Sequence, residues 1–409
     1  MTDNNENKVL NVPPLRFPEF SGEWEEHTLS EYLEFKNGLN PDAKRIGQGL
    51  PFISVMDILA EGVITYNSIR GKVEATDKEI DCFGVKNGDL LFQRSSETLE
   101  DVGRANVYMD SRTAVYGGFV IRGRKIGNYV PLFFKYLLAT PLARKKTCRM
   151  GAGAQHFNIG QEGLSKISLS FPSVKEQEKI ANLLSLIDER IATQNKIIEK
   201  LQSLIKGLND NIHKGIKGET VCFSDLGEAY SGLSGKGGDD FGYGEPFITY
   251  MNVYQNTYIS EKDYELVQIA PNEKQNSVQY GDALFTLSSE TPEEVGIGAV
   301  YLGNTQKLYL NSFCFGIHFY DERVLPQYLA HFISSSSFRR AIYPLAQGST
   351  RFNLQKNDFM KMKFLLPSLE KQGHIANTLD ALHCRLANEK SLTEQYILLK
   401  KYLLSLMFI

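Results

Sequence analysis

Basic side chains gather beside amide and aromatic residues at two places in the chain. Residues 144–149 carry four basic side chains shortly before the segment 155–158, and residues 339–340 precede the segment 350–353 in the same way. Arginine and lysine bind phosphates, and amide side chains in loops can read base edges, so this combination can bind nucleic acid. A helix end is the ordinary alternative, because cations there offset the C-terminal dipole. Charge alone does not decide between the two.

Other basic side chains widen the set of nucleic-acid candidates. Residues 122–125 form a further cluster, and Arg94 and Arg104 align with Leu287 and Ile297 at one offset (287 − 94 = 193; 297 − 104 = 193). Two halves with unequal charges would bind unequal targets. The DNA-binding candidates are Arg94, Arg104, Arg122, Arg124, Lys125, Arg144, Lys145, Lys146, Arg149, Gln155, Arg339, Arg340, Thr350 and Arg351.

The sequence contains none of the common catalytic or cofactor motifs. It lacks a P-loop, a dinucleotide fingerprint, the Asn-Pro-Pro-aromatic run of adenine methyltransferases, a zinc-type histidine spacing and a nucleophile elbow. The polar segment 95–98, repeated at 288–291, favours a turn that caps its own backbone. We expect Phe157 and Phe352 to plug a junction with a following helix rather than stack on bases. We therefore predict no catalytic residue, no metal and no cofactor in this chain.

The sequence contains an internal duplication, and the two copies are related by an almost constant offset. Residues 153–159 recur at 348–354, and the pairs Phe157/Phe352 and Arg190/Arg385 are each 195 residues apart (352 − 157 and 385 − 190). Short β-type runs divided by Gly, Asn and Asp turns precede these landmarks in both halves. We predict an α+β protein with two repeated α/β modules separated by two long helices and related by a pseudo-two-fold axis.

A long helical pattern follows each module. The first opens with Ser173 and Glu176, the spacing of a capping box, and a helix over 174–206 would be roughly 50 Å long. Apolar residues then repeat every three and four positions, as in a coiled coil, with a polar break at Gln194. Pseudo-two-fold symmetry predicts that the two helices pair antiparallel. The predicted seam residues are Ile180, Leu184, Ile187, Ile191, Ile198, Leu201, Ile205, Ile375, Leu379, Leu382, Leu386, Tyr396 and Leu403.

Composition and the positions of the repeated motifs predict the domain boundaries and the cellular compartment of the protein. We predict a flexible tail at 1–19, a first module at 20–172, a helix at 173–217, a second module at 218–366 and a helix at 367–409. The net charge of −3 gives no global basic signature. Five cysteines without a C-x-x-C favour reduced thiols. No signal peptide or membrane-spanning run is visible, so we expect a cytoplasmic protein and no membrane partner.

As an ordered set, these motifs resemble the specificity (S) subunit of type I restriction-modification systems. The resemblance rests on the leader 14–18 (Pro-Leu-Arg-Phe-Pro), on Pro-Ser-x-x-x-Gln-x-x-Ile-Ala at 172–181 and 367–376, and on the repeated Gly-Asp-x-Leu-Phe turn. It implies two target-recognition domains that each read half of a bipartite double-stranded DNA site, and an antiparallel coiled coil that holds them a fixed distance apart.

The same resemblance implies that the chemistry belongs to partner subunits. Two methyltransferase (M) subunits would methylate adenine with S-adenosylmethionine, and restriction/translocase (R) subunits would use ATP and Mg²⁺. The second copy departs from the first, with Gly373 for Glu178, His383 for Asp188 and Cys384 for Glu189, which puts equal partner surfaces on the two helices in doubt. Two alternatives stay open: a two-module protein-binding scaffold, and an enzyme with an unfamiliar site.

Overall fold

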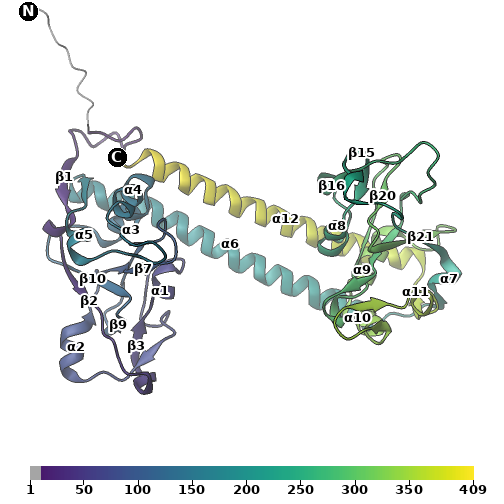
Figure 1. Ribbon diagram of the computed structural model, residues 1–409, viewed down its shortest axis with the longest axis horizontal. Coiled ribbons are helices and arrows are strands. Elements are labelled where there is room, and N and C mark those ends of the chain that lie inside the picture. The colour runs from purple at the N-terminus through teal and green to yellow at the C-terminus, as the bar shows by residue number, and fades with distance from the viewer. Residues whose placement is uncertain (1–10) are drawn as a thin grey trace, which may run out of the picture. The chain divides into compact units, whose positions relative to one another are not determined.

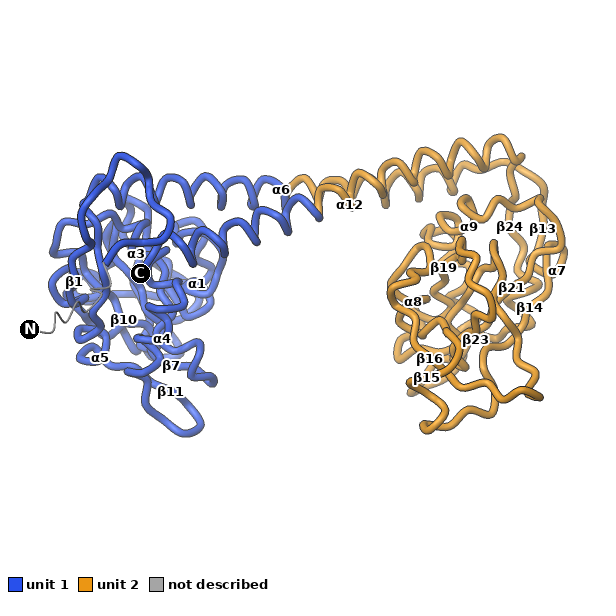
Figure 2. The backbone as a smooth tube through the Cα atoms, turned by 90° about the horizontal axis from the view of Figure 1, so that it is seen from above, with its two compact units in different colours: residues 1–195, 391–409 blue, residues 196–390 orange. Residues whose placement is uncertain are grey.

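The computed structural model describes residues 11–409 and divides into two compact units. Unit 1 contains Met1–Asn195 and Ser391–Ile409, and unit 2 contains Lys196–Lys390 (Figure 2). Two long helices, α6 (Val174–Lys214) and α12 (Leu369–Leu406), each contribute one part to unit 1 and the other part to unit 2 (Figure 1). No helix in the described part is long and apolar enough to cross a membrane.

Unit 1 holds two four-stranded sheets and two short strand pairs. The first sheet is antiparallel with the order β2-β10-β6-β8, and the second has the order β4-β3-β9-β5, with β3 parallel to β9. Strand β1 pairs with β12, and β7 pairs with β11. The strands are β1 (Glu25–Thr28), β2 (Leu33–Asn37), β3 (Ile46–Ile53), β4 (Lys72–Val73), β5 (Gly84–Val85), β6 (Leu90–Gln93), β7 (Ser95–Ser96), β8 (Ala105–Val107), β9 (Ala114–Tyr116), β10 (Val120–Lys125), β11 (Phe157–Asn158) and β12 (Ser168–Phe171). The short helices are α1 (Val55–Leu59), α2 (Asp77–Phe83), α3 (Pro131–Ala139), α4 (Pro141–Cys148) and α5 (Gln161–Ser165).

Unit 2 repeats this plan with two differences: its second sheet has three strands in place of four, and its hairpin sheet has three strands in place of two. Its sheets have the orders β14-β21-β17-β19 and β16-β15-β20, β13 pairs with β24, and β18 pairs with β23 in the sheet β18-β23-β22. The predicted duplication of an α/β module is therefore confirmed. The strands are β13 (Glu219–Cys222), β14 (Gly227–Ser231), β15 (Phe241–Ile248), β16 (Tyr264–Val267), β17 (Ala283–Thr286), β18 (Ser288–Ser289), β19 (Gly298–Val300), β20 (Tyr309–Leu310), β21 (Cys314–Phe319), β22 (Ala346–Gln347), β23 (Phe352–Leu354) and β24 (Lys363–Leu366). The helices are α7 (Phe223–Leu226), α8 (Tyr250–Gln255), α9 (Pro326–Ile333), α10 (Ser336–Ile342) and α11 (Lys356–Met360).

Aromatic side chains fill the main core of each unit. In unit 1 the ring of Trp24 packs edge-on against Phe133 and Phe408, with centroids 6.2 and 6.3 Å away. In unit 2 Phe223 stacks on Phe359 at 5.0 Å. Burying such a side chain stabilises a fold by roughly 1.5–3 kcal/mol. Because Phe408 packs against Trp24, the apolar C-terminus belongs to the core of unit 1.

The two long helices run antiparallel. In unit 1, Leu403 and Met407 near the end of α12 share a core with Ile180 and Leu184 near the start of α6. In unit 2, the start of α12 packs on the end of α6, where Leu379 lies in the core that Leu208 borders. This confirms the predicted antiparallel pairing. The seam residues Ile180, Leu184, Ile187, Ile205, Ile375, Leu379, Leu386 and Leu403 are buried, and Ile191, Ile198, Leu201, Leu382 and Tyr396 are half-buried.

The leader and the start of α6 differ from their predicted form. Residues 1–10 of the predicted flexible tail lie outside the described residues, but the following segment is held in place: Leu15 N–H donates to Leu406 O (3.0 Å). Arg16 forms two 2.7 Å bonds to the carboxylate of Glu176. Ser173 Oγ accepts from Glu176 N–H (3.4 Å) as predicted, but the Glu176 carboxylate binds Arg16 in place of completing the capping box.

Candidate nucleic-acid interface

A short hairpin at one end of each main sheet carries the repeated Phe-Asn segment. In unit 1 β11 pairs with β7, and Asn158 also bridges to Ala152. In unit 2 β23 lies between β18 and β22. The segment 95–98 thus supplies the strand on which this hairpin rests, which explains why its copy at 288–291 is retained.

A glycine gives both hairpins the same turn. Gly153 has φ 141° and Gly348 has φ 144°. A Cβ atom would lie 2.0 Å from His156 O in the first turn and 2.1 Å from Arg351 O in the second, so only glycine fits. The predicted candidates Gln155, Thr350 and Arg351 lie exposed at these hairpin tips. Phe157 and Phe352, which follow the tips, pack against the cores of their units, as the sequence analysis expected.

Arg144 and Arg339 each bond to backbone carbonyls of their own unit, and their assignment as DNA contacts stays a prediction. Arg144 Nη2 donates to the carbonyls of Glu100 (2.9 Å) and Val102 (2.6 Å). Arg339 Nη2 donates to the matching carbonyls of Glu293 and Val295, both at 2.7 Å. Burial lowers the pKa of both guanidinium groups. A repeated arginine that binds repeated carbonyls holds a loop to a helix.

Arg122 and Arg124 also form hydrogen bonds within the fold, and their assignment as DNA contacts likewise stays a prediction. Arg122 is 5% exposed, and its Nη1 donates to Gly84 O (2.8 Å). Arg124 Nε donates to the buried carboxylate of Asp89 at 3.0 Å. In unit 2 the equivalent carboxylate, Asp282, accepts from Tyr230 OH (2.7 Å) and contacts His318 Nδ1 at 2.8 Å. His318 occupies the position of Arg124 (318 − 124 = 194), so each copy places a polar partner over the repeated aspartate.

The remaining basic candidates lie at the surface. Lys125 and Lys146 donate to the nearby carbonyls of Tyr129 (2.7 Å) and Ser168 (2.8 Å). Arg104 pairs with Asp101 at 2.7 Å. Arg94 is half-buried beside the hairpin of unit 1, and Lys145, Arg149, Arg340 and Arg351 are exposed. The structure therefore brings together Arg94 and Gln155 at the hairpin end of unit 1, and Thr350 and Arg351 at that of unit 2.

Sequence reasoning recognised the repeated glutamine of the helix motif but missed its role. Gln177 Oε1 accepts from Val130 N–H (3.0 Å), and its Nε2 donates to Pro172 O (3.0 Å). Gln372 repeats both bonds, to Leu325 N–H (2.7 Å) and Pro367 O (2.9 Å). Each glutamine thus ties the start of a long helix to the start of α3 or α9. The sequence does contain a signal for this role, because the glutamine recurs together with the dipeptide that it binds: Val130-Pro131 in the first copy and Leu325-Pro326 in the second.

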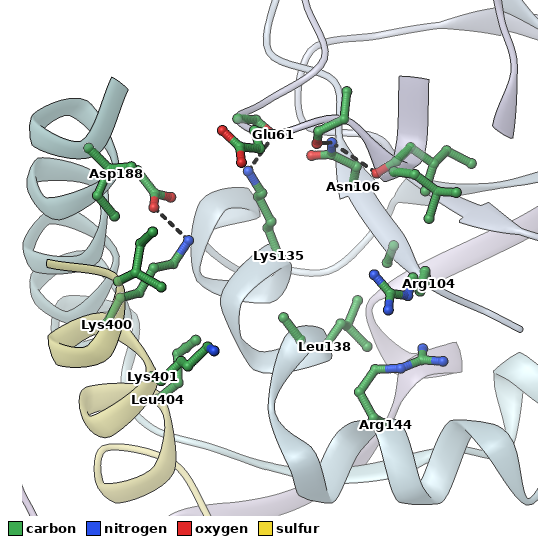
Figure 3. A pocket seen from close by; sticks show the side chains of 18 of the residues that line it. Glu61, Arg104, Asn106, Lys135, Leu138, Arg144, Asp188, Lys400, Lys401 and Leu404 are labelled. Atoms are coloured by element: carbon green, nitrogen blue, oxygen red, sulfur yellow. Dashed lines mark hydrogen bonds and ion pairs between the residues drawn. The ribbon is translucent and has the colours of Figure 1, made fainter. Parts of the chain in front are cut away.

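A cavity of about 670 Å³ lies in unit 1 where the α/β module meets the helices (Figure 3). Lys400 of α12 forms a 2.5 Å ion pair with Asp188 of α6, and Asp188 also accepts from Tyr136 OH at 2.9 Å. Lys135 Nζ donates to Gly62 O, and burial lowers the pKa of Lys135 to about 8. These polar groups of the cavity bind one another and join the module to both helices.

The corresponding junction of unit 2 uses histidine. His331 Nε2 lies 2.7 Å from Asp380 Oδ1, and Tyr258 OH donates to the same oxygen at 2.6 Å. The ring of His383 stacks on His331 with centroids 5.3 Å apart. Burial lowers the pKa of both histidines. His383 and Asp188 occupy equivalent positions (383 − 188 = 195), so the two junctions have the same place but different chemistry.

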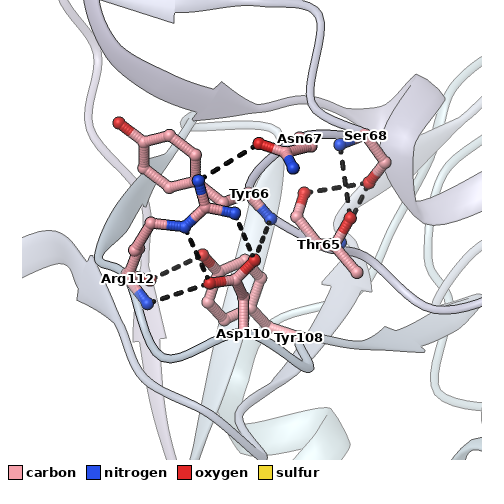
Figure 4. Close-up of polar contacts among 7 residues, drawn as sticks. All are labelled: Thr65, Tyr66, Asn67, Ser68, Tyr108, Asp110 and Arg112. Atoms are coloured by element: carbon pink, nitrogen blue, oxygen red, sulfur yellow. Dashed lines mark hydrogen bonds and ion pairs between the residues drawn. The ribbon is translucent and has the colours of Figure 1, made fainter.

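Unit 1 carries a further polar cluster in the loop that joins β8 to β9 (Figure 4). Arg112 lies 4.2 Å from the centroid of the Tyr66 ring and forms a 2.9 Å ion pair with Asp110. The Arg112 guanidinium holds the pKa of Asp110 well below its usual range. Asp110 also accepts from Tyr66 N–H (3.0 Å), so the cluster fixes one loop against another. No group of three or more His, Cys, Asp or Glu side chains among the described residues could hold a metal ion.

Comparison with known proteins accounts for the repeated architecture. The family model of the type I restriction modification DNA specificity domain matches residues 21–203 and, a second time, residues 218–395. The chain belongs to this family. The putative type I restriction enzyme MjaX specificity subunit of Methanocaldococcus jannaschii is 22% identical over 98% of this chain and 96% of its own length.

Two further members of the type I specificity family are similar. The EcoKI specificity subunit of Escherichia coli (strain K12) is 26% identical over 46% of this chain and 41% of its own length. The crystal structure of the type I restriction-modification S subunit from M. genitalium covers 97% of this chain and 99% of that chain, with a TM-score of 0.56 and 13% identity. At that identity the likeness concerns the fold.

Proposed function

We propose that this chain is the DNA specificity subunit of a type I restriction-modification complex, and that each module reads one half of a bipartite double-stranded DNA site. One observation carries the proposal. The two modules hold hairpins of the same backbone form, set by Gly153 and Gly348, but present unlike side chains at the tips. A fixed scaffold with a variable tip is the arrangement expected of two readers of different base sequences.

The unequal surfaces support two different half-sites. Arg94 and Arg104 in unit 1 stand where unit 2 has Leu287 and Ile297. An arginine can bind a phosphate or the edge of guanine, and the aliphatic side chains can do neither. Each phosphate contact should also contribute about 0.9 to the slope of log K against log salt. We expect the module of unit 1 to show the steeper dependence.

The helices would set the distance between the half-sites and bind the methyltransferase subunits. α6 contains 41 residues, or about 60 Å of helix at 1.5 Å per residue. Exposed apolar side chains along the helices, among them Leu186, Leu204 and Leu398 at 64%, 54% and 63% exposure, would be covered by a partner. We expect two such subunits, together with restriction subunits.

We further propose that the chain is not catalytic by itself and acts in the cytoplasm. Adenine methylation and ATP-driven cleavage would reside in the partner subunits, which would bind S-adenosylmethionine, ATP and Mg²⁺. The support is the chain's own sequence, which lacks the phosphate-binding and methyltransferase motifs that these reactions use.

Mapping of methylated adenines tests the proposal directly. The chain is produced with its methyltransferase partner in a host without other adenine methylation, and single-molecule sequencing records the modified sites. We expect one motif of two defined halves separated by a fixed, unread gap. Replacement of residues 218–366 by those of a relative should change one half only, and four residues inserted beside Gln194 should lengthen the gap only. A continuous motif, or no motif from an assembled complex, would refute the proposal.

A further inference from the structure

Each module exposes one phenylalanine at the same point of its fold. Phe119, directly before β10, is 68% exposed, and Phe313, directly before β21, is 52% exposed. The two are equivalent, because Arg94 N–H donates to Phe119 O (2.9 Å) and Leu287 N–H donates to Phe313 O (2.8 Å). Exposure of a large ring is unfavourable in water, yet both copies show it at the end of the sheet where the hairpin lies.

An arginine lies near each phenylalanine, but it comes from a different element in each unit. In unit 1 it is Arg94, directly after β6, whose Nη1 donates at 3.4 Å to the carbonyl of Gly118, the residue before Phe119. In unit 2 that position is Leu287, and the guanidinium of Arg351, from the hairpin tip, lies 5.2 Å from the centroid of the Phe313 ring. Non-equivalent residues thus place a guanidinium near the exposed phenylalanine of each unit.

A single exposed apolar side chain is ordinary on a protein surface, so recurrence is the important observation. The residues before the rings differ, Gly117-Gly118 in one unit and Asn311-Ser312 in the other, while the ring and the adjacent cation remain. A protein partner would call for a broader apolar patch. One ring next to a guanidinium and a polar hairpin suits a nucleic acid, where aromatic side chains stack on bases or wedge between them and arginine binds the neighbouring phosphate.

We infer that Phe119 with Arg94, and Phe313 with Arg351, are the DNA contacts that unstack or stack upon one base step in each half-site. The inference rests on the proposed function and adds to it two phenylalanines that are not among the DNA-binding candidates identified from the sequence. The ring contacts a deformable base step of the DNA, and the arginine binds the phosphate of the strand beside that step.

The opposite ends of the same strands provide matched controls. Ile126 follows β10 and is 59% exposed, and Tyr320 follows β21 and is 62% exposed. Phe119→Ala, Phe313→Ala, Ile126→Ala and Tyr320→Ala therefore each remove an exposed apolar side chain from one end of a central strand. None of them opens a core, so all four variants should fold.

The experiment uses the full complex of the chain with its methyltransferase partner and the bipartite site found by mapping. Duplexes carry 2-aminopurine at successive positions of one half-site, and its fluorescence reports unstacking. We expect a signal at one step of each half-site. Phe119→Ala should abolish the signal in one half and weaken binding about tenfold, Phe313→Ala should do the same in the other half, and the two control variants should match the unmodified chain.

The outcomes separate this inference from the function on which it rests. If the unmodified complex binds its bipartite site and the phenylalanine variants behave like the controls, the inference is wrong and the proposed function stands. If the unmodified complex recognises no bipartite site, the proposed function fails and the inference with it. Loss of binding to both half-sites from one phenylalanine variant would also overturn the inference, because each ring belongs to one module.

Discussion

The pair of Arg16 and Glu176 should be a main determinant of the stability of unit 1. The leader brings Arg16 to the first turn of α6, where its Nε and Nη2 each lie 2.7 Å from an oxygen of the Glu176 carboxylate. The Glu176 side chain is 1% exposed and that of Arg16 is 13% exposed. α12 has Lys371 at the position of Glu176 (371 − 176 = 195), so only one helix start depends on this pair.

Removal of Arg16 leaves a buried carboxylate without its cation. Loss of one partner of a buried ion pair costs about 3–5 kcal/mol, and the slight exposure of Arg16 places the expected cost near ~3 kcal/mol. A typical domain is stable by about 5–15 kcal/mol, so Arg16→Ala should remove a large fraction of the stability of unit 1. Replacement of both residues by apolar ones, Arg16→Met with Glu176→Leu, should restore most of it, since no charge is then buried.

Tryptophan fluorescence measures this loss in unit 1 alone. Trp24 is the only tryptophan of the sequence, and it is 2% exposed in the core of unit 1. With a urea slope of about 2 kcal/mol per M, a loss of ~3 kcal/mol lowers the unfolding midpoint by about 1.5 M. Glu178→Ala, which removes an exposed carboxylate from the same helix turn, is the control and should leave the midpoint unchanged.

Two results would contradict this reasoning. If Arg16→Ala and Glu178→Ala give the same midpoint, the pair contributes no more than a surface ion pair. If the double apolar variant is as unstable as Arg16→Ala, the loss comes from the leader's packing and not from the uncompensated carboxylate.

Three further predictions concern unit 2. Burial lowers the pKa of His331 and His213. Because the unfolded chain then binds more protons, we expect unit 2 to lose stability as pH falls below about 6.5. The measurement is the hydrogen-exchange protection factor of α9, corrected for the pH dependence of the intrinsic exchange rate: it should be lower at pH 5.5 than at pH 7.5, and equal protection factors would contradict the prediction. Gln372→Ala should cost about 1–3 kcal/mol by leaving Leu325 N–H without its acceptor, measured by thermal unfolding. Gln372→Glu keeps an acceptor for that N–H but loses the two bonds that Nε2 donates to Arg323 O and Pro367 O, so it should also be destabilised; a variant as stable as the unmodified chain would contradict this account. Gly348→Ala should distort one hairpin and alter methylation at one half-site; a methylation map identical to that of the unmodified chain would show that this hairpin does not read DNA.

The duplication and the long helices were predictable because they leave periodic traces in the sequence. One offset relates the landmarks of both halves, and the apolar spacing from Ile180 to Ile205 fixes which face of α6 is covered. Antiparallel pairing then follows from symmetry. The roles of Arg122 and Arg124 could not be read in this way, because their partners Gly84 and Asp89 lie more than thirty residues earlier (122 − 84 = 38; 124 − 89 = 35).

Basic side chains clustered in one local stretch can bind phosphates, and for that reason residues 122–125 are among the DNA-binding candidates. A better signal was available in the comparison between copies. Arg144 and Arg339 recur together with the carbonyl acceptors that they bind inside the fold. Arg122 and Arg124 carry no such signal, because unit 2 has Gly316 and His318 at their positions (316 − 122 = 194; 318 − 124 = 194). Phe119 and Phe313 escaped notice because exposure of an aromatic ring cannot be read from local sequence.

The two copies divide their residues between constant ties and variable surfaces, and this division has a physical reason. Gln177 and Gln372 satisfy backbone groups at helix starts, where an unpaired donor is costly, so any drift there would weaken the fold of that module. The hairpin tips at Gln155 and Thr350 face solvent and satisfy nothing inside the protein, so they can change at little energetic cost. A recognition surface placed on such tips can acquire a new target while the ties beneath it keep the module folded and joined to its helices.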